Sequence, residues 1–96
     1  MTTPEDRHQI YTKCFELLPI SRGELARLFN LGEPPTPSTR SRVSDKLNGV
    51  PGKGITKPEA LAMQMLVLLH NAGVDIEKLK FDDTGQLCSL QGDKST

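Results

Sequence analysis

Apolar residues recur at helical spacing in four segments of the chain, and each segment follows a residue that can cap a helix. The caps are Thr3, Ser21, either Thr36 or Ser38, and Thr56. Ser21 and Thr56 are each followed three residues later by a glutamate, which is the pattern of a capping box. Pro19, Gly32, Gly49 and Gly73 are typical helix ends. The pattern predicts four helices.

The third and fourth segments differ strongly in apolar content. The third, which ends at Asn48-Gly49, has only Val43 and Leu47 as sizeable apolar residues and is otherwise rich in hydroxyl and basic side chains. The fourth runs from Ala60 to Leu69 with one polar residue, so we expect it to be buried on most sides, with Met63 and Met65 filling the core. Cys14, on the apolar face of the first helix, is also expected in the core.

The C-terminal segment carries the signals of turns and short strands. Residues 74–79 fit either one further helical turn or an extended link, and residues 79–81 and 86–90 flank a turn at 82–85 that is typical of a small β-hairpin. An isolated hairpin is marginal in water, so it should pack against the bundle or a second subunit. The candidate dimerisation residues are Leu79, Phe81, Leu87 and Leu90.

Together these elements predict a mainly α fold: a compact four- to five-helix bundle with a small C-terminal β-hairpin. The 96 residues are enough for one domain, expected over residues 1–90, and the small polar residues 91–96 are expected to form a disordered tail.

Composition narrows the class of protein. Twelve basic and twelve acidic residues give a formal net charge of zero, so only a local patch could attract nucleic acid. The polar N-terminus has no signal-peptide pattern, and no apolar run is long enough to span a membrane, so a cytoplasmic protein without membrane contact is expected. Cys14 and Cys88 have no metal or redox spacing and are expected to be free thiols, with a disulfide as the alternative.

Catalytic and cofactor motifs find little support in the sequence. His8 and His70 have no cysteine or acidic residue at a metal-ligand or relay spacing, and the glycines at 49, 52 and 54 lack the context of a phosphate-binding loop. We therefore expect no enzyme, no cofactor and no metal.

Basic residues gather around the apolar-poor third segment. Arg40, Arg42, Lys46, Lys53 and Lys57 lie within eighteen positions. Arginine, lysine, serine and threonine are the side chains that contact phosphates and base edges, and an α-helix fits the major groove of DNA. A solvated helix followed by a charged loop would show the same residues.

Residues 21–49, "SRGELARLFNLGEPPTPSTRSRVSDKLNG", resemble the helix-turn-helix of the lambda-repressor-like DNA-binding family. The capped "ELARLFNL", the small Ala26, and Val43 and Leu47 in "SRVSDKLNG" carry the resemblance, and residues 55–73 resemble the next core helix of that family. The family usually has glycine where this chain has Asn30, and its turn is several residues shorter than the one here.

The resemblance implies a sequence-specific transcription regulator, such as a repressor of phage or bacterial origin, that binds double-stranded DNA as a homodimer. The side chains expected at the DNA are Arg22, Ser38, Thr39, Arg40, Ser41, Arg42, Lys46, Lys53 and Lys57.

The alternative is a protein-binding module of the same fold, such as an antitoxin or an inhibitor of a nucleic-acid enzyme complex. Acidic clusters at 5–6, 75–77 and 82–83 favour this alternative if they share a face with Arg40 and Arg42, and they favour DNA binding if they lie opposite.

Overall fold

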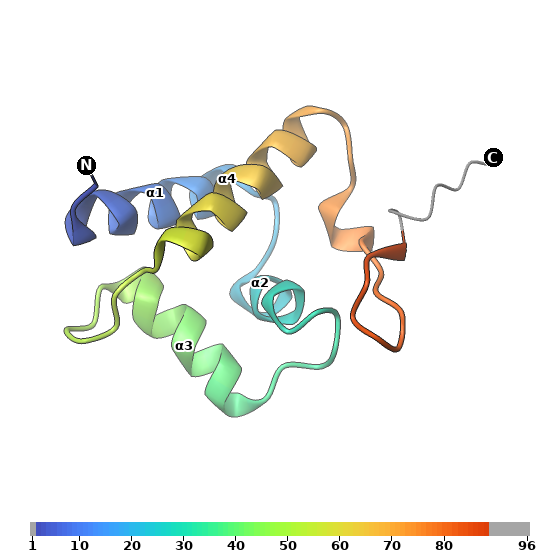
Figure 1. Cartoon of the computed structure of the whole chain (residues 1–96), viewed down its shortest axis with the longest axis horizontal. Helices are drawn as coiled ribbons and strands as arrows, with labels where there is room; N and C mark the ends of the chain where they lie inside the picture. Colours follow the sequence, from blue (N-terminus) through green and yellow to red (C-terminus); the bar gives the residue numbers. More distant parts are fainter. Residues whose placement is uncertain (1, 89–96) are drawn as a thin grey trace.

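Four α-helices and one 3₁₀ turn make up the fold, as seen in a computed structural model that describes residues 2–88. The elements are α1 (Pro4–Leu17), α2 (Arg22–Phe29), α3 (Pro37–Asn48), α4 (Lys57–Asn71) and the 3₁₀ helix η1 (Ile76–Lys78) (Figure 1). η1 confirms the helical alternative for residues 74–79.

Side-chain caps begin all four helices. Thr3, Ser21, Thr36 and Thr56 each accept a hydrogen bond from the backbone N–H three residues later, which satisfies a donor that has no partner inside the helix. Thr56 and Glu59 form the full capping box that the sequence predicts. In α2 only the Ser21 half forms, because the carboxylate of Glu24 binds Arg27 instead, at 3.0 Å.

The core lies where α1 packs on α4 and α2 packs on α3. Tyr11, Leu25 and Met63 are almost completely buried, and the Tyr11 ring stacks on Phe29 with 6.4 Å between ring centroids. Cys14 is buried as expected, and both cysteines are free thiols. The buried apolar side chains are Tyr11, Cys14, Leu18, Leu25, Ala26, Leu28, Val43, Ile55, Ala60, Met63, Ile76 and Leu79.

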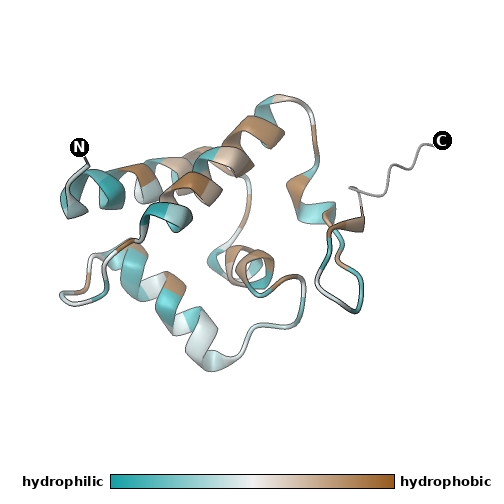
Figure 2. Ribbon diagram, viewed as in Figure 1, coloured by the Kyte–Doolittle hydropathy of each residue, from teal (hydrophilic) through white to brown (hydrophobic). Residues whose placement is uncertain are grey.

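The expectation that α4 is buried on most sides is wrong. Ala60 and Met63 face the core, but Leu61, Met65 and Leu68 are 58%, 52% and 62% exposed. Met63 is therefore core filler and Met65 is not. In Figure 2, α4 carries hydrophobic colour along most of its length, whereas α3 is largely polar. The reason is that, within residues 2–88, α4 packs mainly on α1, with a smaller contact to η1, and its remaining side faces solvent.

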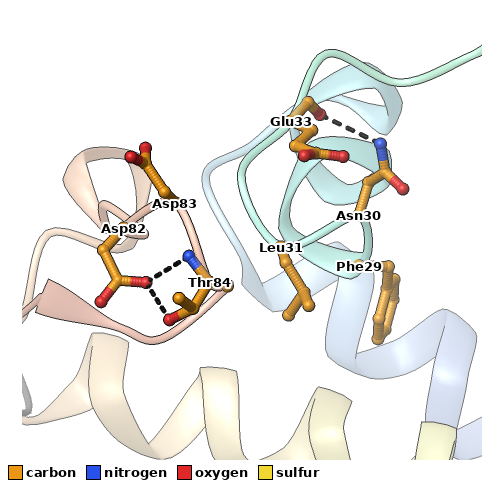
Figure 3. Close-up of a pocket in the computed structure, with 8 residues that line it drawn as sticks. Phe29, Asn30, Leu31, Glu33, Asp82, Asp83 and Thr84 are labelled. Carbon is orange, nitrogen blue, oxygen red and sulfur yellow. Dashed lines mark hydrogen bonds between the residues drawn. The ribbon is translucent and has the colours of Figure 1, made fainter.

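The predicted β-hairpin is not seen as two strands in the part of the chain that the structure describes, which ends at residue 88. Within residues 2–88 the structure has an isolated antiparallel bridge between Phe81 and Leu87, closed by a hydrogen bond from the N–H of Asp82 to the carbonyl of Gln86 at 2.8 Å. The side chain of Asp82 accepts hydrogen bonds from Thr84 and Gln86, so the segment is a tight turn rather than a ribbon (Figure 3). The expected tail at 91–96 lies outside the described residues.

This C-terminal turn packs on the long connection between α2 and α3. Gly32 has a φ of +86° and lies so close to Phe81 that a Cβ added there would fall 2.5 Å from the ring. In return, Leu31 lies against Gly85. Asn30, where the resembling family has glycine, donates from Nδ2 to the carbonyls of Glu33 and Pro34, both at 3.3 Å. The connection is thus held from both sides, and it sets where α3 begins.

Candidate nucleic-acid interface

α3 is seated on the bundle by very little apolar surface. Val43 is 4% exposed and Leu47 is partly buried against the core, as the sequence predicts. Thr36 caps the helix, Pro37 occupies the first turn and Gly49 ends it with a φ of +71°, a left-handed conformation that glycine adopts at little cost. The sequence left Thr36 and Ser38 open as caps, and Thr36 has that role.

The side of α3 opposite Val43 is a polar ridge made of Ser38, Ser41, Asp45 and Asn48. These positions share one face of a helix with about 3.6 residues per turn. Ser38, Ser41 and Asn48 are exposed, and Asp45 is half-buried. Sequence reasoning used Asn48 only as a helix end, although its spacing of three from Asp45 and seven from Ser41 places it on the ridge.

Arg40 and Arg42 flank the polar ridge on opposite sides, because two residues along a helix turn the direction by about 200°. Both are exposed, and neither side chain makes a hydrogen bond or an ion pair within the described part of the chain. Arg42 lines a hollow of about 260 Å³ with Thr39, whose hydroxyl is bonded to that of Thr36 at 3.0 Å.

Lys46 lies on the same side of α3 as Arg42 but closer to the core. Its ammonium pairs with the carboxylate of Glu59 on α4, and its side chain is 18% exposed. Burial acts to raise the pKa of Glu59, but the hydrogen bonds from Lys46 and Thr56 outweigh it and lower the pKa below its ordinary value. Lys46 therefore joins α3 to α4 and has no free charge to offer a ligand.

Arg22, at the first position of α2, is brought to the C-terminal end of α3. Its guanidinium donates to Oδ1 of Asn48 at 3.3 Å, across 26 positions of the sequence. Both side chains are exposed. The contact extends the polar ridge of α3 onto the beginning of α2, whose N-terminal N–H groups also favour negative charge.

The loop between α3 and α4 carries Lys53 and ends near Lys57, and both lysines are exposed. Arg7 holds the loop to α1 through a 2.7 Å hydrogen bond to the carbonyl of Ile55. Lys53 lines a hollow of about 290 Å³ together with Glu5, His8 and the glycines at 52 and 54. The sequence indicated a phosphate contact for Lys53. It gave no sign that Glu5 lines the same hollow, because the two residues are 48 positions apart.

The other two acidic clusters lie elsewhere. Asp75 and Glu77 belong to η1, and Asp82 and Asp83 to the C-terminal turn, at the other end of the molecule from the loop that carries Lys53 (Figure 1). Asp82 and Asp83 line a hollow of about 270 Å³ with Glu33 (Figure 3). Glu5 belongs to the acidic cluster that lines a hollow together with one of the expected phosphate contacts, Lys53.

The expected dimerisation residues are largely used inside one chain. Leu79 is 9% exposed, and Phe81 and Leu87 pack partly buried against the core. Leu90 lies outside the described residues. The described part of this segment thus supports the α2–α3 connection and offers little apolar surface of its own.

Few side chains have the environment of a reactive group. Burial raises the pKa of the Cys14 thiol, and burial together with the nearby Glu59 raises the pKa of Tyr11, so both stay protonated near neutral pH. Residues 2–88 contain no group of three or more His, Cys, Asp or Glu side chains placed to hold a metal ion. None of the helices found there has the length and apolar character needed to cross a membrane.

Comparisons of the chain with models of protein families, with curated proteins and with solved structures found no match. The candidate interface therefore rests on its geometry alone: the polar ridge of α3, its two flanking arginines, the Arg22–Asn48 contact and the lysines of the following loop.

Proposed function

We propose that this protein binds double-stranded DNA by inserting α3 into the major groove, and that it acts as a regulator of transcription. α2, the connection and α3 would be its helix-turn-helix. The observation that carries the proposal is α3 itself: a helix with one buried side chain that presents a hydroxyl-rich ridge between two unpaired arginines. Such a helix gains little stability from its own packing, so its composition needs another explanation, and groove recognition supplies one.

In this proposal the contacts divide into two kinds. Arg42, Ser38 and Ser41 read base edges, with Thr39 beside them and Arg40 on the other flank. Arg22 and Lys53 contact the phosphate backbone, which gives affinity and sets the register without reading the sequence. Lys46, because it is paired with Glu59, keeps α3 at its angle to α4 rather than touching DNA.

The long connection between α2 and α3 fits this assignment. Residues 30–36 separate the helices, and the C-terminal turn holds them through Phe81 on Gly32 and Leu31 on Gly85. A recognition helix must be held at a fixed angle if its side chains are to meet particular base pairs. A short turn would fix the angle between the two helices by its own geometry. In this longer connection, the packing of Phe81 against Gly32 has that role.

The experiment begins with selection of binding sites from random DNA duplexes at low salt, where electrostatic attraction is strongest. The purified protein should enrich a defined sequence. Arg42→Ala should then weaken binding to that sequence by roughly 1–3 kcal/mol and relax the preference at one base pair. Lys80→Ala, which removes one positive charge from the C-terminal segment, is the matched control and should change the affinity little. If no duplex is enriched, the proposal is wrong.

A protein partner is the second candidate, and Asp45 is the observation that favours it. A carboxylate at the centre of the polar ridge is repelled by phosphates, and the chain has no net positive charge to offset it. Asp45→Asn separates the two functions. The change should tighten binding to DNA, and it should weaken binding to a protein partner that pairs a basic side chain with Asp45.

A further inference from the structure

An apolar stripe runs along the exposed side of α4. Leu61, Met65, Leu68 and Ala72 follow one another at intervals of four, three and four residues, which places them on one face of the helix and of its C-cap. All four are exposed, the first three by more than half of their surface. A stripe at this spacing is the pattern with which one helix packs along another.

The stripe carries no charge. Between Glu59 and the end of α4 the helix has no Asp, Glu, Lys or Arg, and the exposed neighbours on one flank are the neutral Gln64 and Asn71. On the other flank Leu69 extends the apolar surface. Covering this face would therefore bury no unpaired charge, whereas leaving it in water exposes leucine side chains at a cost.

We propose that the stripe of α4 packs against the same stripe of a second copy of this chain, with the two helices antiparallel across a two-fold axis near Met65. In this arrangement Met65 meets its own counterpart, and Leu61 of one copy meets Leu68 of the other. Methionine suits a position next to its own image, because its flexible side chain fills irregular gaps.

The ends of α4 complement each other in the same arrangement. Lys57 is exposed at the beginning of the helix, and an antiparallel partner places the C-terminal end of its own α4 there. That end carries the negative pole of the helix dipole, which attracts a lysine. A parallel pair would instead bring the two lysines together. The charge pattern thus favours antiparallel pairing of two copies, because each copy supplies both the lysine and the helix end that the lysine meets.

The size of the stripe determines how tight the dimer is. Its few exposed side chains and their neutral flanks offer less than the roughly 800 Å² per partner of a standard interface. We therefore expect a dimer that forms reversibly in the micromolar range rather than an obligate one.

Self-association does not require DNA. Its consequence for recognition rests on the proposed function: α4 and α3 lie on different sides of the bundle (Figure 1), so a dimer through α4 leaves both polar ridges free to meet two half-sites. All measurements below use protein alone, so a failure of DNA binding and a failure of the dimer give separate results.

Sedimentation equilibrium over a range of protein concentrations tests the proposal. The full chain should pass from monomer to dimer, and the double variant Leu61→Lys with Leu68→Lys should weaken the dimer at least about tenfold while keeping its helical circular dichroism. Leu17→Lys is the matched control, because Leu17 is 62% exposed, like Leu68, but lies at the end of α1, and it should dimerise like the wild type. A chain that stays monomeric, or a dimer that the double variant leaves unchanged, overturns the proposal.

A cross-link tests the two-fold axis without relying on a weakened interface. With the exposed Cys88 changed to serine, Met65→Cys should form a disulfide-linked dimer under a mild oxidant, because the two sulfurs meet at the axis. Leu17→Cys in the same background should remain monomeric. Equal cross-linking of both variants would indicate random collision and overturn the proposed geometry.

Discussion

α3 and α4 are two helices of similar length that are buried to a similar, small extent, and they expose opposite kinds of surface. α3 buries Val43 and presents hydroxyl groups and arginines, whereas α4 buries Ala60 and Met63 and presents leucines. Neither surface is explained by the stability of a single copy. A polar exposed helix suits a polar partner such as DNA, and an apolar exposed helix suits another protein surface.

The comparison also shows how the two helices depend on the rest of the chain. α4 lies along α1, and its position follows from that packing. α3 packs on α2 and α1 with Val43 buried between them, and it is further held by the α2–α3 connection, which the C-terminal turn supports, and by the Lys46–Glu59 pair. The polar helix therefore needs outside support, and the first three predictions concern that support.

The largest effect is expected at Gly32, under Phe81. Gly32→Val should lower the free energy of unfolding by about 3 kcal/mol or more, because a Cβ would overlap the ring and a β-branched residue is strained at a positive φ. Chemical denaturation followed by circular dichroism measures the loss. Gly52→Val is the control, because Gly52 also has a positive φ but has no atom near enough to clash. Equal losses in the two variants would show that Phe81 does not support the connection.

A smaller effect contrasts the apolar residues of the two helices directly. Val43→Ala should cost roughly 1–2 kcal/mol of stability, since it removes buried methyl groups and leaves a cavity beneath α3. Leu61→Ala on α4, although it removes more atoms, should change the stability of the monomer by less than about 0.5 kcal/mol. Denaturation at a concentration where the chain is monomeric checks both values. A larger loss for Leu61→Ala would mean that α4 is more covered than its exposure indicates.

The pair that joins the two helices should make stability depend on pH. Glu59 has a lowered pKa in the folded chain, so its contribution is fully present above the unfolded value near 4.5 and is lost as the pH falls below it. Glu59→Gln should be less stable than the wild type at neutral pH, by about 1 kcal/mol. The difference should shrink as the pH is lowered from 5 to 3 in thermal denaturation. A constant difference over that range would exclude the ion pair as the cause.

Much of the fold could be foreseen because local signals determine it. Thr3, Ser21, Thr36 and Thr56 fix where the helices begin through hydrogen bonds within one turn, and Gly49 fixes an end. The burial of α4 could not be foreseen in the same way. The sequence of an apolar segment is the same whether its leucines lie in the core or in water. How many of them are buried depends on how many helices pack around the segment. The sequence pattern of the hairpin was also ambiguous, because the acceptor groups of Asp82 favour a tight turn over a longer ladder.

The sequence predicted which residues of the candidate site are exposed better than it predicted which of them lie close together. The spacing of α3 indicated which side chains leave the core, and Arg40, Arg42, Ser38 and Ser41 are exposed. Three relations join distant parts of the chain and left no local signal: Lys46 with Glu59, Arg22 with Asn48, and Lys53 with Glu5. Each of these contacts or shared surfaces changes which other groups the charged side chain can interact with. Lys46 is paired with a carboxylate, Arg22 is directed to the end of α3, and Lys53 shares a hollow with Glu5.

The smallest expected effect concerns Lys53 and Glu5, which line one hollow at the edge of the polar surface. If Lys53 contacts a phosphate, Lys53→Ala should weaken binding to specific and non-specific duplexes alike and reduce the slope of log affinity against log salt by about one. Glu5→Gln should act in the opposite direction, because it removes a carboxylate from the hollow that Lys53 lines. The gain should be modest, since both side chains are exposed and salt screens their interaction. Fluorescence anisotropy at several salt concentrations measures both slopes.

If Glu5→Gln leaves the affinity and the salt slope unchanged while Lys53→Ala lowers both, Lys53 meets the backbone away from Glu5. If neither variant changes the slope, the DNA contact ends with α3, and the apolar α4 and the polar α3 are joined by a loop that takes no part in binding.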